Sequence, residues 1–464
     1  MPERRPAPDV PLPPTLQAGP SPRGFRIGLY LEHLEEAAAL WEQRPADRAN
    51  PELAWTDLGA DEGRLALHLD ALVLGGDLAL AVCRQQALDG DAGELHAALR
   101  VFCRHGRSDL VGVAMEGVDP DDADALDALS DALVAELPPA WEAGALRADR
   151  LVDPRRLRLA ADLVAHRQLP GRDALLDALP DAPPALRARL VRALGRTADG
   201  IVEGAVRPLL DDADPEVRLE AAVALLRSGA PEAPPAVLRG ARTDPALVPA
   251  LALAGHGGVV PWLHDVLRHP PSAAVAADAL GLLGDPRSVP PLIDALTTDA
   301  AGPAARALDL ITGAGLTDDA FVEDVLDDGE LFDDERALRA RGEPVGPPGQ
   351  PPRGTTVTLP SADAARWQAW WAEHEGRFAE ADRYRLGQPA GPVSQVGSLA
   401  APFVPHRLRR WIADELAVRY RMAVPFDPAW EVGRQRAALG AMAAWAEAAR
   451  FVPGRWYVAA QYAS

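Results

Sequence analysis

The stretch ALGLLGDPRSVPPLIDAL at residues 279–296 decides the fold class. Its first half is an apolar helical segment that ends at Gly284, and its second half begins a new helix with Pro290 in the first turn. A Gly just past a helix supplies a left-handed residue, and a Pro in the first turn removes no helical hydrogen bond. The stretch therefore predicts two short helices joined by a tight turn.

The same arrangement recurs along the chain. Ala-Leu pairs begin at residues 193, 224, 250, 279 and 307, which are 31, 26, 29 and 28 residues apart. Each pair lies in an apolar stretch that ends at a Gly, namely Gly195, Gly229, Gly255, Gly284 and Gly313. A helix pair of this length cannot bury its apolar faces alone, so neighbouring pairs must stack. The predicted fold is all-α, a HEAT-type α-solenoid with an N-terminal helical cap and a separate C-terminal helical module.

Two segments carry a resemblance to known repeats. DPEVR at residues 214–218, followed by Ala221, Ala222 and Gly229, resembles the HEAT pattern, and residues 279–296 are similar to the HEAT-like repeats of phycobilisome lyases. In physical terms, Asp214 is expected to cap a helix that Pro215 begins, and Arg218 to bridge neighbouring repeats near that turn.

Composition divides the chain into five segments. Residues 318–335 hold 10 acidic residues and no basic one, and seven of the 11 Trp lie beyond residue 360. We expect a disordered Pro-rich leader at 1–26 and an N-terminal cap with degenerate repeats at 27–183. HEAT repeats follow at 184–317, then an acidic and Pro/Gly-rich linker at 318–360, and a Trp/Arg-rich helical module at 361–464.

The charge of the chain restricts its partners. The net charge is -21, and residues 353–464 hold 14 Arg against 10 acidic residues, so the acidic excess lies before them. Nucleic acid and anionic membranes are therefore disfavoured as partners. The acidic body with a mildly basic end suggests a basic protein partner or self-contact, and the alternative is that the acidic surface serves solubility alone. The leader lacks an apolar core, and no run of 18 apolar residues occurs, so we expect a cytoplasmic protein. Cys83 and Cys103 are predicted to be reduced structural thiols.

The sequence lacks the motifs of common enzymes. All 47 basic residues are Arg, which excludes Lys chemistry, and no nucleophile elbow, HExxH or dinucleotide fingerprint occurs. A metal group at His256, His264, Asp265 and His269 is disfavoured against single His residues at helix ends. A calcium loop at Asp324, Asp328, Gly329 and Glu335 is disfavoured because Leu326 and Phe332 replace ligands. We therefore predict no catalytic residue, no metal and no cofactor.

The Trp-rich end supplies the candidate partner-binding residues. Aromatic and Arg side chains anchor many protein interfaces. The candidates are Trp367, Trp370, Trp371, Arg407, Arg410 and Arg434. The alternative is that these Trp side chains pack the core of their own module.

The order of motifs is also similar to an uncharacterised bacterial family of HEAT-like repeat proteins. The resemblance rests on HLEEAAALW at 33–41, RLALHLDAL at 64–72, ITG at 311–313, Trp370-Trp371 and RYRLGQP at 383–389. Members of that family are often encoded beside type VI secretion components. The resemblance therefore implies a non-catalytic scaffold or adaptor, an accessory of a contractile tail that binds a secretion effector or component. Two alternatives stay open, a lyase-like or ligand-handling HEAT protein and an immunity-like inhibitor of a basic partner.

Overall fold

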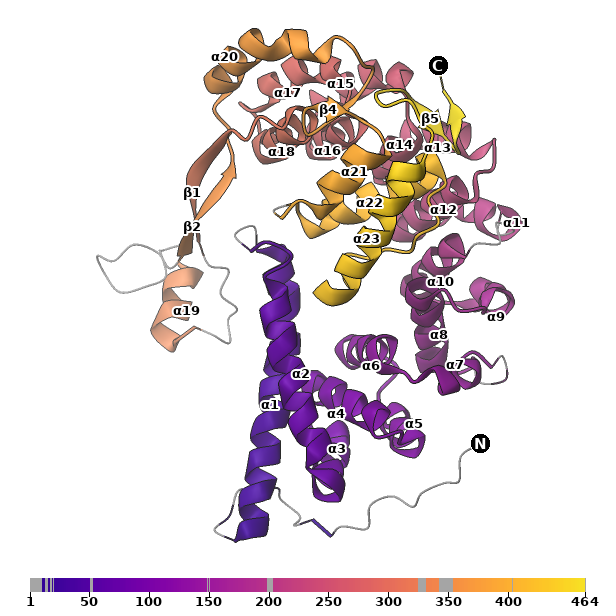
Figure 1. Cartoon of the computed structure of the whole chain (residues 1–464), viewed down its shortest axis with the longest axis vertical. Helices are drawn as coiled ribbons and strands as arrows, with labels where there is room; N and C mark the ends of the chain where they lie inside the picture. The colour runs from indigo at the N-terminus through magenta and orange to yellow at the C-terminus, as the bar shows by residue number, and fades with distance from the viewer. Residues whose placement is uncertain are drawn as a thin grey trace.

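The computed structural model describes residues 11–12, 16, 19, 21–50, 53–147, 149, 151–197, 203–323, 331–341, 354–402 and 404–463. Helices dominate these ranges and follow one another along an arc (Figure 1). The N-terminal helices are α1 (Pro22–Ala49), α2 (Leu58–Leu74), α3 (Gly76–Asp89), α4 (Ala92–Arg104), α5 (Ser108–Gly117), α6 (Ala123–Glu136), α7 (Pro139–Ala145), α8 (Pro154–Arg167) and α9 (Arg172–Ala178).

The repeats continue the arc with shorter helices. They are α10 (Pro184–Arg196), α11 (Glu203–Val206), α12 (Pro215–Ser228), α13 (Ala233–Ala241), α14 (Val248–Ala254), α15 (Val260–Leu267), α16 (Ala273–Leu283), α17 (Val289–Ala295) and α18 (Ala301–Thr312). From α4 to α18, each even-numbered helix packs on the next even-numbered helix. These helices form one continuous row, which we call the inner row. The predicted all-α solenoid is confirmed, and its inner row begins well before residue 184.

Helix ends in the repeats follow the expected chemistry at most positions. The Asp214 carboxylate accepts hydrogen bonds from the amides of Glu216 and Val217, so the predicted cap of α12 is confirmed. Gly229, Gly284 and Gly313 end α12, α16 and α18 with φ of 77°, 74° and 58°.

Two glycines differ from this expectation. Gly195 lies inside α10, where an added Cβ would come 2.7 Å from the Ala224 Cβ of α12, so its role is close helix packing. Gly255 ends α14 with φ of -64°, which any residue can adopt.

The polypeptide after α18 forms small sheets and further helices. They are β1 (Thr317–Glu323), α19 (Asp333–Ala340), β2 (Gly354–Pro360), α20 (Ala364–His374), β3 (Tyr384–Arg385), β4 (Gln388–Pro389), α21 (Pro392–Ala400), α22 (His406–Tyr420), α23 (Val432–Ala448), β5 (Tyr457–Val458) and β6 (Gln461–Tyr462). β1 and β2 pair antiparallel, with Thr317 opposite Pro360 and Glu323 opposite Gly354. The described parts of the expected linker at 318–360 therefore contain a strand pair and a helix.

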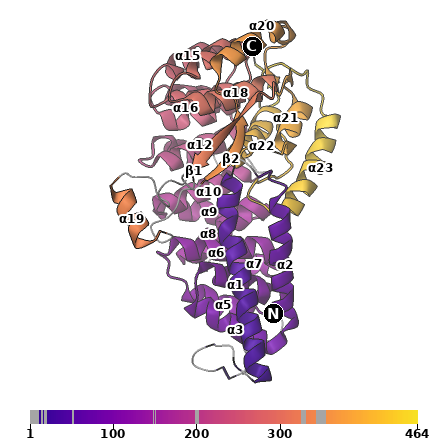
Figure 2. The ribbon, with the colours of Figure 1, turned by 90° about the vertical axis from the view of Figure 1, so that its left-hand side faces the viewer.

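The C-terminal helices lie inside the arc (Figure 1), and the view turned by 90° shows α21, α22 and α23 along one side of the stack (Figure 2). α22 packs on α12 and α14, α20 packs on α17, and α23 contacts α2. Side chains from Trp367 to Trp456 belong to the same apolar core as the repeats. The segment 361–464, expected as a separate module, thus shares its core with the solenoid, because its Trp and Leu side chains cover apolar surface that the repeats leave open.

A buried ionic cluster fastens this segment to the repeats. Glu415 of α22 pairs with Arg383, Arg385 and Arg419, and all four side chains are fully buried. The same guanidiniums donate to backbone carbonyls at the ends of repeat helices: Arg383 Nε to Leu283 at 3.0 Å, Arg385 Nη2 to Leu282 at 2.7 Å and Arg419 Nη2 to Ala252 at 2.8 Å. Carbonyls at helix ends lack helical partners, so these Arg side chains satisfy groups that the repeats alone leave open. We call this group the Glu415 cluster.

No single described helix is long and apolar enough to cross a membrane. Helices α2 and α3 meet that test only as a pair, and the pair is bent by 118°.

Cys83 of α3 and Cys103 of α4 are buried free thiols, and burial raises the pKa of each to about 12. Both thiols therefore stay protonated at neutral pH.

Candidate functional site

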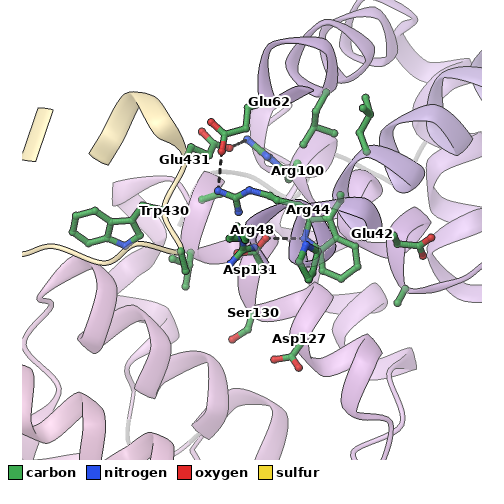
Figure 3. A pocket seen from close by; sticks show the side chains of 18 of the residues that line it. Glu42, Arg44, Arg48, Glu62, Arg100, Asp127, Ser130, Asp131, Trp430 and Glu431 are labelled. Atoms are coloured by element: carbon green, nitrogen blue, oxygen red, sulfur yellow. Dashed lines mark hydrogen bonds and ion pairs between the residues drawn. The ribbon is translucent and has the colours of Figure 1, made fainter. Parts of the chain in front are cut away.

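A pocket of about 900 Å³ lies among the N-terminal helices. Its walls come from the C-terminal half of α1, the start of α2, and side chains of α4, α6, α8 and α10. Four residues of the C-terminal segment also line it, Ala429, Trp430, Glu431 and Arg434, of which Figure 3 labels Trp430 and Glu431. We call residues 427–434 the C-terminal strap. The pocket therefore exists only where the two ends of the chain meet.

Acidic side chains outnumber basic ones in the pocket wall, 11 to five. The acidic residues are Glu42, Asp47, Asp61, Glu62, Asp91, Asp122, Asp124, Asp127, Asp131, Asp162 and Glu431, and the basic residues are Arg44, Arg48, Arg100, Arg189 and Arg434. A concave wall with an excess of one sign concentrates its electrostatic potential, so the pocket attracts cations.

Part of this excess arises from helix capping. The Asp91 carboxylate accepts from the Glu94 amide at 2.8 Å at the start of α4, and Asp122 accepts from the Ala125 amide at 3.0 Å at the start of α6. A capping carboxylate stabilises a helix N-terminus, and these two helices begin at the pocket. The two capping carboxylates therefore also place negative charge at the edge of the pocket, which we call the rim.

Other rim carboxylates are crowded together. Burial and then the charge of Asp91 raise the pKa of Glu42, and burial and then the charge of Asp61 raise the pKa of Asp47. Like charges at close range repel, so a cation placed between them would relieve that repulsion. The rim is therefore built to favour a positively charged group.

Trp41 and Asp131 line the floor of the pocket, and His96 packs against Trp41. Trp41 Nε1 donates to Asp131 Oδ2 at 2.8 Å, and the fully buried His96 stacks on Trp41 with ring centroids 4.8 Å apart. Burial lowers the pKa of His96, so its imidazole is neutral at pH 7. Burial alone would raise the pKa of Asp131, but its contacts with His96, Arg44 and Trp41 hold it well below the usual range. The floor thus retains a carboxylate that faces the pocket.

The strap is tied to both sides of the pocket. Glu62 of α2 accepts from Arg44 Nη2 at 2.9 Å and from the Val432 amide at 2.7 Å. Arg100 of α4 pairs with Glu431 at 2.9 Å. On the other side, Trp430 Nε1 donates to His166 Nδ1 at 3.1 Å (Figure 3 shows Trp430, Glu431 and Glu62). The strap therefore holds the N-terminal helices and α8 at a fixed separation.

The six residues predicted from the sequence do not form one surface. Trp367 is fully buried and donates from Nε1 to the Ser361 carbonyl at 2.7 Å, while Trp370 and Trp371 are half-buried against the same core. Arg407 is exposed and pairs with Asp278 of α16, and Arg410 pairs with Glu220 of α12. Arg407 and Arg410 thus join the C-terminal segment to the repeats by ion pairs, and the three Trp side chains pack in the apolar core that both parts share.

Arg434 is the one predicted residue that reaches the pocket wall. Its guanidinium lies 3.8 Å from the centroid of the Trp430 ring and donates to the His166 carbonyl. Sequence reasoning missed the other pocket residues because they come from six helices far apart in the chain. The capping signals at Asp91 and Asp122 are the local patterns that could have pointed to the rim.

The described residues contain no group of three or more His, Cys, Asp and Glu side chains placed to hold a metal. His256 Nδ1 accepts from the Gly258 amide at 3.1 Å, and His264 Nε2 lies 3.1 Å from Ser288 Oγ. Of the calcium-loop positions, Asp324, Asp328 and Gly329 lie outside the described residues. Glu335 lies in the first turn of α19, and its carboxylate accepts a hydrogen bond from the Phe332 amide.

The pH dependence of stability should report on His406, the first residue of α22. Burial and then the charges of Arg48 and Arg409 lower its pKa to about 4. Between this value and the ordinary 6.5 the unfolded chain binds more protons, so the contribution of His406 to the free energy of unfolding falls as pH drops from 6.5 toward 4. We expect His406→Gln to reduce this fall, measured by urea unfolding at pH 7 and pH 5. An identical pH slope in both proteins would contradict it.

Comparison with known protein families finds repeats in one part of the chain. A family described as HEAT repeats matches residues 172–250, which run from α9 into α14. No curated protein matches the chain. Residues 172–250 are thus similar to HEAT repeats, which are commonly protein-interaction scaffolds and generally non-catalytic.

Proposed function

We propose that this chain is a non-catalytic scaffold that binds a basic segment of a partner protein in the pocket between α1, α6 and the C-terminal strap. The observation that carries the proposal is the excess of acidic side chains in the pocket wall, 11 against five Arg. Solenoids use their inner surface for binding extended partners, and here the strap restricts that surface to one pocket. An Arg or Lys of the partner would enter between the crowded rim carboxylates.

Charge also argues against other partners. The chain carries a net charge of -21, and phosphate backbones would be repelled by the rim. The volume of about 900 Å³ also suits a small molecule, as the lyase-like alternative requires. The charged wall favours the protein partner, because small-molecule pockets are lined mainly by apolar side chains.

The biological setting of the proposal rests on the family resemblance. It implies an adaptor or accessory of a type VI secretion system, with a basic effector or component as the partner. An immunity-like inhibitor of a basic toxin would use the same pocket and the same charge. These settings share one physical requirement, a cationic segment that fits the acidic rim.

Peptide binding tests the proposal. We expect a fluorescent octa-arginine peptide to bind the full chain at low salt, and an octa-glutamate peptide not to bind. The triple variant Glu42→Gln, Asp47→Asn and Asp124→Asn should weaken octa-arginine binding by about tenfold or more, because each exposed charge pair is worth about 0.5 to 1 kcal/mol. Fluorescence anisotropy at two salt concentrations measures both effects.

The matched control removes the same charge elsewhere. Asp294, Asp299 and Glu447 are exposed and lie outside the pocket wall. The triple variant Asp294→Asn, Asp299→Asn and Glu447→Gln should bind octa-arginine like the unaltered chain. Equal losses in the two triple variants would show that only net charge matters, and the proposal would fail.

A further inference from the structure

Arg48 differs from the other cations in the pocket wall. Arg44 pairs with Glu62, Arg100 pairs with Glu136 and Glu431, and Arg189 pairs with Asp127 and Asp162. Arg434 stacks on Trp430. Arg48, near the end of α1, forms no ion pair with any described residue although it lines the pocket. A partly buried guanidinium without a carboxylate is costly, so the protein leaves a charge there uncompensated.

Other buried nitrogens near Arg48 also lack a hydrogen-bond partner among the described residues. They include Arg44 Nε, His406 Nε2 and Arg409 Nη2, and Arg48 Nε itself is one more. Arg409 is held nearby, since its guanidinium lies 4.2 Å from the centroid of the Trp55 ring and its Nη1 donates to Gln435 at 2.6 Å. The first turn of α22, which begins at His406, contains no acidic residue and no side-chain cap.

The nearby carboxylates are engaged elsewhere. The acids that act on Arg48 are Asp131, Asp427 and Glu62. Asp131 accepts from Trp41, Asp427 pairs with Arg196 at 2.7 Å, and Glu62 pairs with Arg44. Desolvation and the neighbouring charge of Arg44 lower the pKa of Arg48 to about 10, which reflects this shortage of negative charge. An added anion would therefore be stabilised by Arg48 without competing for an existing pair.

We infer that Arg48, with Arg44 beside it, forms an oxyanion subsite at one end of the acidic pocket, and that it binds a carboxylate or phosphate group. The charges of both Arg48 and Arg409 act on His406, so Arg409 lies close enough to add positive potential. The inference rests on the proposed function and deepens it: the partner segment is not uniformly basic but carries an acidic group next to its Arg or Lys residues. Guanidiniums bind carboxylate and phosphate through parallel hydrogen bonds, so both sources share this chemistry.

The first experiment uses free anions on the full chain. At constant ionic strength and pH 6.5, replacing chloride with inorganic phosphate should raise the melting temperature by about 2 °C or more at tens of millimolar. Acetate in a parallel series tests the carboxylate. The rise should disappear in Arg48→Gln and return largely in Arg48→Lys, whereas Arg268→Gln, at an exposed Arg outside the pocket, should behave like the unaltered chain. Because Arg48 forms no ion pair within the described part of the chain, Arg48→Gln should fold normally, which circular dichroism checks.

The second experiment uses matched peptides. An Arg-rich peptide with a phosphoserine, and one with a free terminal carboxylate, are compared with their serine and amide forms. The subsite predicts about fivefold tighter binding of an anionic form, despite its lower positive charge, and the form that gains identifies the source. Arg48→Gln should abolish that difference, while the acidic triple variant should weaken all forms alike.

The outcomes separate the two proposals. If no Arg-rich peptide binds but phosphate or acetate still stabilises through Arg48, the proposed function fails and the oxyanion subsite stands. If the peptides bind but Arg48→Gln changes neither the anion response nor the preference for an anionic form, the subsite is refuted. An equal loss in Arg268→Gln would refute it as well.

Discussion

Replacing Glu415 with Gln should destabilise the chain by about 3 to 5 kcal/mol, since removing one partner of a buried ion pair leaves uncompensated charge. Three guanidiniums, those of Arg383, Arg385 and Arg419, would then be buried without a carboxylate. The same three side chains hold repeat carbonyls, so the loss should loosen the C-terminal segment from the solenoid.

Urea unfolding monitored by Trp fluorescence measures this effect, because seven of the 11 Trp lie beyond residue 360. Glu447→Gln is the matched control: Glu447 is exposed on α23, and its replacement should change the free energy of unfolding by less than about 0.5 kcal/mol. A loss below about 1 kcal/mol in Glu415→Gln would contradict the view that the Glu415 cluster fastens the two parts.

The cluster also gives a pH signature. Burial alone would raise the pKa of Glu415, but the guanidiniums of Arg383, Arg385 and Arg419 lower it to about 2. A lowered carboxyl pKa contributes stability that is complete above the ordinary value of 4.5 and is lost as pH falls toward 2. The stability difference between the unaltered chain and Glu415→Gln should therefore shrink between these two pH values.

Replacing Gly284 with Ala should cost about 3 kcal/mol or more. Gly284 ends α16 with φ of 74°, where a Cβ alone costs about 1 to 2 kcal/mol. An added Cβ would also come 2.2 Å from the Tyr384 carbonyl oxygen, at the place where the Tyr384 amide donates to the Gly284 carbonyl at 2.7 Å. The backbone of the C-terminal segment would have to move away from the repeat.

Gly315→Ala separates the two costs. Gly315 has φ of 63°, and nothing lies within 4 Å of its added Cβ, so only the backbone cost of about 1 to 2 kcal/mol applies. Thermal or urea unfolding of both variants measures the difference, which is assigned to the contact with Tyr384. Equal losses would show that this contact does not fasten the segment.

The sequence predicted the solenoid well because its signals are local. The glycines at 229, 284 and 313 and the cap at Asp214 act within a few residues, so they can be read without knowing the rest of the chain. Gly195 was misassigned because the reason for a glycine there is Ala224 of the next repeat, and a contact across helices has no local pattern.

The candidate site was less predictable for the same reason. The sequence left two roles open for the Trp residues of α20, partner binding and core packing. Their burial depends on α17, which packs on α20 and lies far from it in the sequence. The pocket combines residues that lie far apart in the sequence, such as Glu62 and Glu431, so neither segment alone indicates it. Composition did predict the acidic character of the candidate site, because the acidic excess before residue 353 is visible in the sequence.

The strap has a consequence for the order in which this protein is made. In a simple repeat array each helix pair contacts only its neighbours, so folding can follow synthesis from one repeat to the next. Here the Val432 amide reaches Glu62, 370 positions earlier, and closing so long a loop is slow. The N-terminal helices therefore leave the ribosome long before the pocket they line is complete. A nascent chain that has not yet reached residue 427 therefore lacks part of the pocket wall.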